Sequence, residues 1–349
     1  MIRREQTRRT ARERSEAEGY FARLEERFEE AEAAAGPVSP TVLGVAGTTV
    51  ELRLAGRALE PVLLPALRHL AVPAPRPDGL TVLAFDSAST GVDPPPPPAP
   101  AAAADPEVAR ILQRGAGLFS MLDRRRSVAL LWTRDAARVP WNEVAAPLRM
   151  ILQPWLAPRG WQLVHAGAVG THRGGVLLVG RSGAGKSTTA LACLAAGLGY
   201  AGDDYVLAAA SPAPEVQGLY ASAKLREDRL DAFPELARRV VNPRRGADEK
   251  PVLFLDDGLR AHLVRRMPLR AVVVPRVTGT AEPALRPISA AAALAAAAPS
   301  TLFQIPLDRS GALRRLRRLV EACPCWELEA GPDLAGIAAA IGSLLAEAG

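Results

Sequence analysis

The stretch that decides the fold reads GRSGAGKS, from Gly180 to Ser187, and it fits the phosphate-binding P-loop pattern G-x-x-x-x-G-K-[ST]. The apolar residues 176–179 before it predict a buried strand, and residues 188–196 after it predict a helix. The motif requires this strand-loop-helix context. Its glycines let backbone N–H groups point at phosphate oxygens, and the start of the helix adds a partial positive charge there. The sequence therefore predicts a site for the phosphates of a nucleotide.

Lysine is scarce in this chain, which draws attention to the lysine of the loop. Lys186, Lys224 and Lys250 are the only three, so the 43 basic residues include 40 arginines. Lysine and arginine are not interchangeable at a phosphate, so a lysine that remains is a candidate for function. Lys186 would reach the β- and γ-phosphates, and the Ser187 hydroxyl would bind Mg²⁺. The predicted phosphate-binding residues are Gly180, Ser182, Gly183, Ala184, Gly185, Lys186, Ser187 and Thr188, with Lys224 and Arg226 as further phosphate-clamping cations.

Length and composition set the broad class of the protein. The 349 residues favour two domains over one, and 48% hydrophobic residues suffice for sizeable cores. The net charge of +6 comes from scattered arginines, so we expect no nucleic-acid partner. The Arg-rich start lacks an apolar signal region, and no run of about 18 apolar residues occurs. We therefore expect a cytoplasmic protein that does not enter a membrane.

Three parts of the chain differ in composition. Residues 1–36 predict a charged amphipathic helix, because aromatic and leucine side chains recur at four-residue spacing. Residues 37–157 predict a smaller α/β domain for a substrate or partner, with a polyproline loop at 93–106. Residues 158–349 predict the P-loop domain, in which strands and helices alternate around a mixed or mostly parallel sheet.

Three local predictions are open to direct comparison with the structure. We expect helices over 59–70 and 141–156, and one strand over 162–169 that carries His165. No convergent set of polar residues occurs within 37–157, so that half is assigned to substrate recognition or packing.

A P-loop site needs a carboxylate that completes the coordination of Mg²⁺ or acts on the attacking nucleophile. Two acidic pairs are candidates for it. Asp203-Asp204 lies one helix and one turn beyond Lys186, a distance that fits a neighbouring strand delivering both carboxylates to the phosphates. Asp256-Asp257 follows a more hydrophobic run and looks more like the strand end of an ordinary Walker-type ATPase. We favour the first pair and interpret the second as a solvated turn.

Three ordered elements between residues 162 and 207 resemble the catalytic core of the HPr kinase/phosphorylase family. They are LVHAGAV, which contains His165, then VLLVGRSGAGKS, and then YAGDD, which ends at Asp204. That family combines a strand histidine, a G-x-S-G-x-G-K-S loop and an Asp-Asp pair beyond the loop lysine. The resemblance implies a C-terminal domain with an α/β fold of the HPr kinase/phosphoenolpyruvate carboxykinase type.

The same resemblance implies an ATP-dependent phosphotransferase that uses ATP and Mg²⁺ to phosphorylate a serine of a protein or peptide. Asp204 would take the proton from the acceptor hydroxyl, and Asp203 would support Mg²⁺. His165 would orient the carboxylates or contact phosphate, and Lys186 would complete the catalytic set.

The chain departs from the family at one signature. An Arg-Gly-Leu-Gly-Ile stretch is absent, and residues 220–227 read YASAKLRE instead. The chain therefore resembles a divergent relative with another substrate, such as the kinases of peptide-modification gene clusters that phosphorylate a serine of a precursor peptide. The reverse reaction, phosphorolysis, does not follow from the resemblance.

Two alternatives stay open. A kinase for a small hydroxylated molecule would share the core chemistry. A P-loop ATPase or nucleotide-dependent switch would use the N-terminal half as an interaction module, although no Leu-Ser-Gly-Gly-Gln signature is present. The sequence also leaves the acceptor and the oligomeric state open, a homo-oligomer included.

Overall fold

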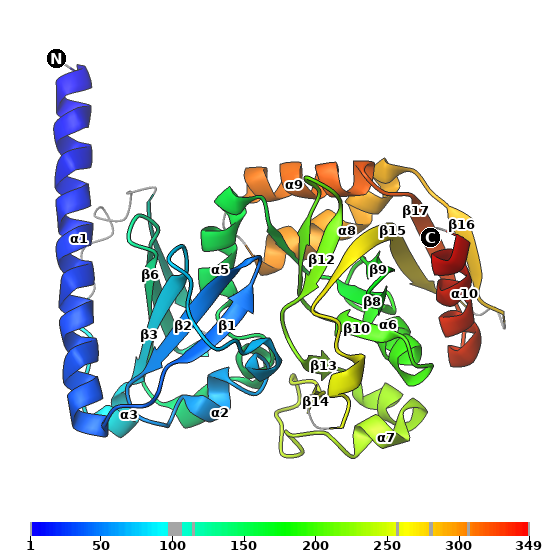
Figure 1. Ribbon diagram of the computed structural model, residues 1–349, viewed down its shortest axis with the longest axis horizontal. Helices are drawn as coiled ribbons and strands as arrows, with labels where there is room; N and C mark the ends of the chain where they lie inside the picture. Colours follow the sequence, from blue (N-terminus) through cyan, green and yellow to red (C-terminus); the bar gives the residue numbers. More distant parts are fainter. Residues whose placement is uncertain are drawn as a thin grey trace. The chain divides into compact units, whose positions relative to one another are not determined.

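The chain forms two compact units in the computed structural model (Figure 1). Unit 1 consists of Met1–Leu64 and Leu70–Trp155, and unit 2 consists of Pro65–His69 and Leu156–Gly349. The structure describes residues 2–96, 107–113, 116–255, 258–278, 282–305 and 308–347.

Unit 1 is built on a mixed sheet with the strand order β1-β2-β3-β6-β5-β4. The central pairs β2–β3 and β3–β6 are parallel, and the outer pairs are antiparallel. The strands are β1 Thr41–Val45, β2 Thr48–Leu54, β3 Leu80–Asp86, β4 Val108–Gln113, β5 Leu118–Asp123 and β6 Val128–Thr133. The helices are α1 Ile2–Ala35, α2 Glu60–Leu63, α3 Ser87–Thr90, α4 Trp141–Ala145 and α5 Arg149–Leu156, with 3-10 turns at Arg68–Leu70 and Ala136–Arg138. β4 was not predicted from the sequence.

The predicted amphipathic helix is present as α1, drawn in dark blue in Figure 1. Its apolar side chains Tyr20, Leu24 and Phe28 are buried at the spacing that the sequence shows. They share a core with Leu83 and Phe85 of β3. This apolar stripe fixes which side of the helix faces the sheet.

The helix predicted over 59–70 is wrong. The structure has only α2, Glu60–Leu63, followed by the 3-10 turn at Arg68–Leu70. Pro65 ends the helical run, because proline lacks the N–H that would continue it and its ring clashes with the preceding turn. Segment Pro65–His69 belongs instead to unit 2, where the carbonyl of Ala66 accepts a hydrogen bond of 2.8 Å from the Ala221 N–H.

The helix predicted over 141–156 is interrupted. It consists of α4 and α5, which are separated at Leu148, a residue with φ of 62°. This left-handed conformation cannot continue a right-handed helix, and Pro147 before it supplies no N–H.

Unit 2 is built on a second mixed sheet with the strand order β10-β8-β9-β15-β12-β11-β7, to which β17 is added beside β15 and β16 beside β17. The long strand β15 pairs in parallel with β9 and β17 and antiparallel with β12. The strands are β7 Gln162–Val164, β8 Gly167–Thr171, β9 Gly174–Leu178, β10 Gly199–Gly202, β11 Val206–Ala209, β12 Glu215–Gly218, β13 Ser222–Lys224, β14 Val252–Phe254, β15 Arg266–Val277, β16 Ala284–Pro287 and β17 Cys325–Ala330. β13 and β14 form a separate small sheet, and β16 is a strand that the sequence analysis missed.

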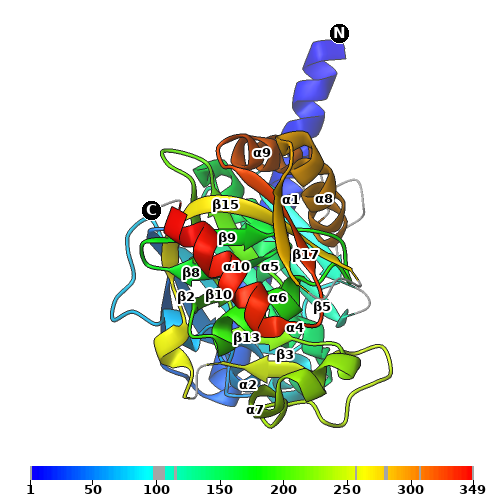
Figure 2. The ribbon, with the colours of Figure 1, turned by 90° about the vertical axis from the view of Figure 1, so that its right-hand side faces the viewer.

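Helices cover both faces of this sheet. The helices of unit 2 are α6 Lys186–Ala195, α7 Pro234–Ala237, α8 Ala290–Gln304, α9 Arg309–Glu321 and α10 Leu334–Glu347, with 3-10 turns at Ala157–Arg159, Glu227–Ala232 and Arg260–His262. Successive side chains of a strand point to opposite faces. Helices α6 and α10 lie on one face of the sheet, and α8 and α9 lie on the other (Figure 2). Accordingly Val176 and Leu178 of β9 pack in the core with α6 and α10, whereas Leu177 packs in the core with α8 and α9. The predicted mixed α/β class is confirmed.

The single strand predicted over 162–169 is also wrong. The chain forms β7, bends at His165 and then enters β8. β7 pairs with β11, whereas β8 pairs with β9 and β10, so the two strands lie in different parts of the sheet. The bend frees His165 from strand pairing and leaves its side chain available to the site described below.

Candidate functional site

The P-loop connects β9 to α6. Gly183 has a φ of 84° and Gly185 a φ of 103°, conformations that a residue with a Cβ rarely adopts. They turn the backbone sharply enough for α6 to begin at Lys186, directly after the loop. The strand-loop-helix context that the motif requires is therefore present.

The Lys186 side chain folds back into the loop and is only 6% exposed. Its ammonium donates hydrogen bonds to the carbonyl oxygens of Gly180, at 2.8 Å, and Arg181, at 3.1 Å. Burial lowers the pKa of Lys186 to about 8, although the charges of Asp204 and Asp203 oppose this shift. The loop thus holds a compact cation at the position where the motif places phosphate oxygens.

Asp203 follows β10 and is 2% exposed. Its Oδ2 accepts the backbone N–H of Lys224 at 3.2 Å, while its buried Oδ1 has no hydrogen-bond partner among the described residues. Burial, together with the charge of Asp204, raises the pKa of Asp203 to about 6. A buried carboxylate oxygen without a partner is costly, and a metal ion would satisfy it.

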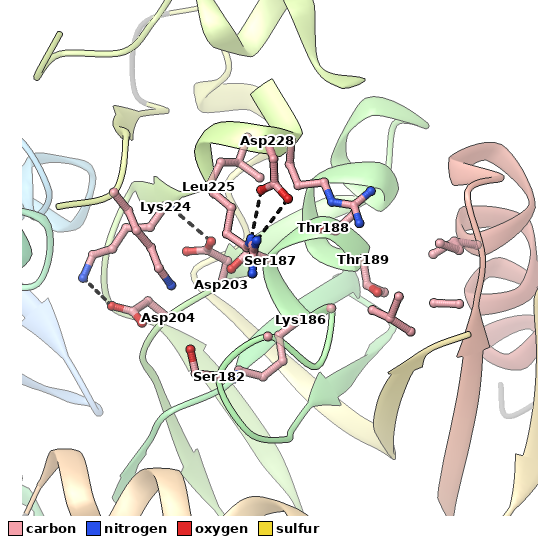
Figure 3. Close-up of a pocket in the computed structure, with 18 of the residues that line it drawn as sticks. Ser182, Lys186, Ser187, Thr188, Thr189, Asp203, Asp204, Lys224, Leu225 and Asp228 are labelled. Carbon is pink, nitrogen blue, oxygen red and sulfur yellow. Dashed lines mark hydrogen bonds and ion pairs between the residues drawn. The ribbon is translucent and has the colours of Figure 1, made fainter. Parts of the chain in front are cut away.

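Asp204 is held between two partners. Its Oδ2 accepts a hydrogen bond of 2.6 Å from the Lys224 ammonium, and its Oδ1 lies 3.1 Å from His165 Nε2. Burial alone would raise the pKa of Asp204, but the Lys224 charge and the His165 ring hold that pKa well below its usual range. Asp204 is therefore ionised at neutral pH. Figure 3 shows both carboxylates and Lys224 close together near Ser187.

His165 is fixed by unit 2 itself. Its backbone N–H donates to the Thr301 hydroxyl of α8 at 3.1 Å, and its ring lies 5.3 Å from the Tyr205 ring. Its Nδ1 is buried and has no hydrogen-bond partner in the part of the chain that the structure describes. These contacts direct Nε2 at Asp204.

One cavity of about 280 Å³ brings the predicted residues together. Those that line it are His165, Ser182, Gly183, Gly185, Lys186, Ser187, Thr188, Asp203, Asp204, Lys224 and Arg226. Gly180 and Ala184 lie elsewhere, on a groove along the other side of the loop. Arg226 is exposed and forms a two-pronged ion pair with Asp228, at 2.9 and 3.0 Å, so its guanidinium already has a partner. The roles assigned to these residues stay predictions.

Lys250, to which the sequence motifs assign no role, lines the same cavity. All three lysines of the chain therefore meet there. The buried side chain of Asn242 fixes the backbone on either side of Pro251. Its Nδ2 donates a hydrogen bond to the Lys250 carbonyl at 3.0 Å, and its Oδ1 accepts one from the Val252 N–H at 2.8 Å. Because lysine is scarce in the sequence, Lys250 could have been named as a candidate site residue from the sequence alone.

A second wall of the cavity is apolar and was also missed. It includes Val277 at the end of β15, Ala330 at the end of β17 and Ile337 of α10. Clefts that bind organic ligands combine such apolar walls with a few placed polar groups. No sequence motif marks this wall, because its residues come from three separate elements.

A Mg²⁺ ion fits the polar side of the cavity. Asp203 offers the buried carboxylate oxygen without a partner, and Ser187 lies on the same cavity. Among the described residues, no group of three or more His, Cys, Asp and Glu side chains is arranged to hold a metal ion. Mg²⁺ in proteins usually binds one or two carboxylates together with substrate phosphates and water.

Two other predictions cannot be compared with the structure. Asp256 and Asp257 lie outside the described residues, as do residues 97–106 of the polyproline loop. In the segments that are described, no helix combines the length and the apolar character needed to cross a lipid bilayer.

The comparisons with known proteins gave matches among solved structures alone. No protein-family model matches the sequence, and no curated protein matches it. Among solved structures, the chain is similar to the HPr(Ser) kinase/phosphatase from Coxiella burnetii, with 10% identity and a TM-score of 0.31. The match covers 53% of this chain and 97% of that one. A likeness this distant does not establish a shared fold, so membership of the HPr kinase-related family stays a prediction.

Proposed function

We propose that unit 2 is an ATP-dependent kinase that transfers a γ-phosphoryl group to a hydroxyl of a protein or peptide. One observation carries the proposal: the ionised Asp204, bonded to His165 and Lys224, lies in the same cavity as the P-loop lysine Lys186. A hydroxyl group needs a base, and a phosphoryl group needs fixed cations around it. This cavity supplies both.

In the proposed reaction, the acceptor oxygen forms a bond to the γ-phosphorus while the bond from that phosphorus to the ADP oxygen breaks. Asp204 takes the proton of the acceptor hydroxyl, and ADP leaves. A base with a low pKa suffices, because phosphoryl transfer proceeds through a loose transition state and depends mostly on positioning and charge. His165 Nε2 and the Lys224 ammonium orient the Asp204 carboxylate toward this task.

The three lysines supply the positive charge. Lys186 sits inside the loop, and Lys224 and Lys250 line the same cavity. Fixed cations in a partly enclosed site stabilise developing negative charge more than they would in water. Mg²⁺, bound through Asp203 and Ser187, would neutralise the charge that develops on the phosphate oxygens.

We extend the proposal to the family and its fold. The three sequence elements that resemble the HPr kinase-related group form separate strands, loops and a helix within residues 162–207, and their key residues His165, Lys186 and Asp204 line one cavity. This supports a divergent kinase of the HPr kinase/phosphoenolpyruvate carboxykinase type. Unit 1 is then assigned to the choice of acceptor, and the protein to the cytoplasm, where ATP and Mg²⁺ are available.

A labelling experiment tests the function. The purified protein is incubated with γ-labelled ATP, Mg²⁺ and a host lysate, and the labelled species are identified by mass spectrometry. We expect a labelled polypeptide whose labelling requires Lys186. Label found in a small molecule would favour the metabolite kinase, and label found only in free phosphate would favour the ATPase.

A further inference from the structure

The outer face of α8 is apolar where a solvated helix would carry charges. Ala290–Gln304 contains no charged residue, although 23% of the whole chain is charged. We call Ala292, Ala295, Pro299 and Phe303 the α8 face; all four are exposed, and they recur at intervals of three and four residues. A helix that is apolar all round is usually buried on all sides. The α8 face is therefore suited to contact with another molecule.

Phe303 dominates this face, with 79% of its surface exposed. A single exposed apolar side chain on a protein surface needs no explanation. Phe303 differs because it ends a continuous apolar stripe on its own helix. Aromatic side chains of this kind supply much of the binding energy at protein interfaces.

Three hydrogen bonds attach the same end of α8 to the candidate site. The Ser300 hydroxyl donates to the P-loop carbonyl of Gly180 at 3.3 Å, and the Thr301 hydroxyl accepts the backbone N–H of His165. Oε1 of Gln304 accepts a hydrogen bond of 3.1 Å from the Tyr205 hydroxyl. Phe303 lies three residues after Ser300, a spacing that makes the two neighbours on the helix surface. A molecule seated on the α8 face is thereby placed beside the P-loop.

The α8 face also continues toward the cavity. A groove beside the loop is lined by Ala295 and Ala296 of α8 and by Val277, which is itself exposed. Val277, Ser182 and Gly183 line both this groove and the candidate nucleotide cavity. The groove that Ala295 of the α8 face lines and the phosphate site thus share residues.

We propose that the α8 face is the docking surface for the polypeptide acceptor, and that Phe303 contacts an apolar side chain close in sequence to the phosphorylated hydroxyl. This inference rests on the proposed kinase function. A polypeptide is the occupant because the surface offers apolar area without charges, which a small polar metabolite cannot use. Its continuity with the cavity places the acceptor hydroxyl near Asp204.

The test uses the full-length protein, γ-labelled ATP, Mg²⁺ and an array of synthetic peptides centred on serine. In each set one flanking position is fixed as Leu, Ala, Asp or Lys. We expect the wild type to prefer Leu at one flanking position. Phe303→Ala should raise the KM for those peptides roughly 10- to 30-fold, as for the loss of an aromatic anchor, with kcat and the KM for ATP unchanged. Leu313→Ala, on the exposed part of α9, is the matched control and should change none of these values.

Four outcomes would overturn the inference. If Phe303→Ala keeps the wild-type KM, or if the wild type shows no apolar preference, the docking role fails while the kinase stands. If Phe303→Glu converts a dimer to a monomer in sedimentation, the α8 face is a contact between copies. If the wild type turns over ATP but labels no peptide, the polypeptide acceptor itself is withdrawn.

Discussion

Each unit of the molecule contains an ion pair that is at least partly removed from water: Arg149 and Glu143 are buried in unit 1, whereas Lys224 and Asp204 are half-buried in unit 2. In unit 1, Arg149 Nη1 donates to Glu143 at 2.6 Å and to the Ala146 carbonyl at 3.3 Å, and its Nη2 makes a second bond to Glu143. In unit 2, Lys224 binds Asp204, which also contacts His165 and lines a cavity. Glu143 of the first pair lines a cavity of only about 20 Å³, whereas the cavity at the second pair, of about 280 Å³, leaves room for a ligand. Burial of charge alone does not mark a functional site; open space and further titratable groups beside it do.

The largest expected effect comes from removing the loop cation. Lys186→Ala should lower nucleotide-dependent phosphoryl transfer by about 10³-fold or more, because a fixed cation in the site is lost. Alanine favours the helix at this position, so the fold should persist. Isotope transfer from γ-labelled ATP, with circular dichroism as the control for folding, measures both. A folded variant with unchanged turnover would remove the kinase proposal.

The two ion pairs should respond differently to loss of their cations. Arg149→Met should destabilise unit 1 by about 3–5 kcal/mol, because it leaves the buried Glu143 carboxylate unpaired. Lys224→Met should cost unit 2 less than about 1 kcal/mol of stability, since that pair is partly exposed to the cavity. Hydrogen exchange followed separately in peptides of each unit gives both values.

The double variant Glu143→Leu with Arg149→Met sharpens this comparison. Replacing both partners of a buried pair by apolar side chains is often close to neutral, so most of the lost stability should return. Equal destabilisation by Arg149→Met and Lys224→Met would contradict the distinction between a structural pair and a site pair.

A smaller effect concerns pH and unit 2. Burial, with the charges of Arg265 and Arg260, lowers the pKa of His69 to about 4 from its ordinary 6.5. The unfolded chain therefore binds a proton in this window and the folded chain does not, so stability falls as pH drops from 6.5 to 4, by about 3 kcal/mol in total. Hydrogen exchange of unit 2 across this range should show the loss, and His69→Gln should reduce it. His172→Gln, at an exposed histidine, is the control; an unchanged slope in His69→Gln would contradict the expectation.

Local patterns in the sequence predicted the loop and the long amphipathic helix. Within the P-loop motif, the position of each residue follows from its offset from Lys186. The apolar stripe of α1 is enough to predict which side of that helix packs on the sheet. The mixed α/β class followed from the alternation of strands and helices in the same way. These features depend on residues that are neighbours in the sequence.

Features that depend on distant contacts could not be predicted. The bend at His165 exists because β7 and β8 pair with different strands, and the break at Leu148 separates two helices whose apolar pattern is continuous. Lys250 reaches the cavity because the buried Asn242 bonds to the chain on both sides of Pro251. No sequence pattern encodes these distant contacts, although the scarcity of lysine marked Lys250 as unusual.

The measurement that tests the central claim most directly compares Asp204→Asn with the wild type for two quantities, the affinity for Mg²⁺-bound ATP and the rate of phosphoryl transfer. The amide is close in shape to the carboxylate but cannot take the acceptor proton. The account predicts that nucleotide affinity is retained while the rate of transfer falls by about 10²–10⁴-fold. Transfer at the wild-type rate would contradict the claim that Asp204 is the base of this site.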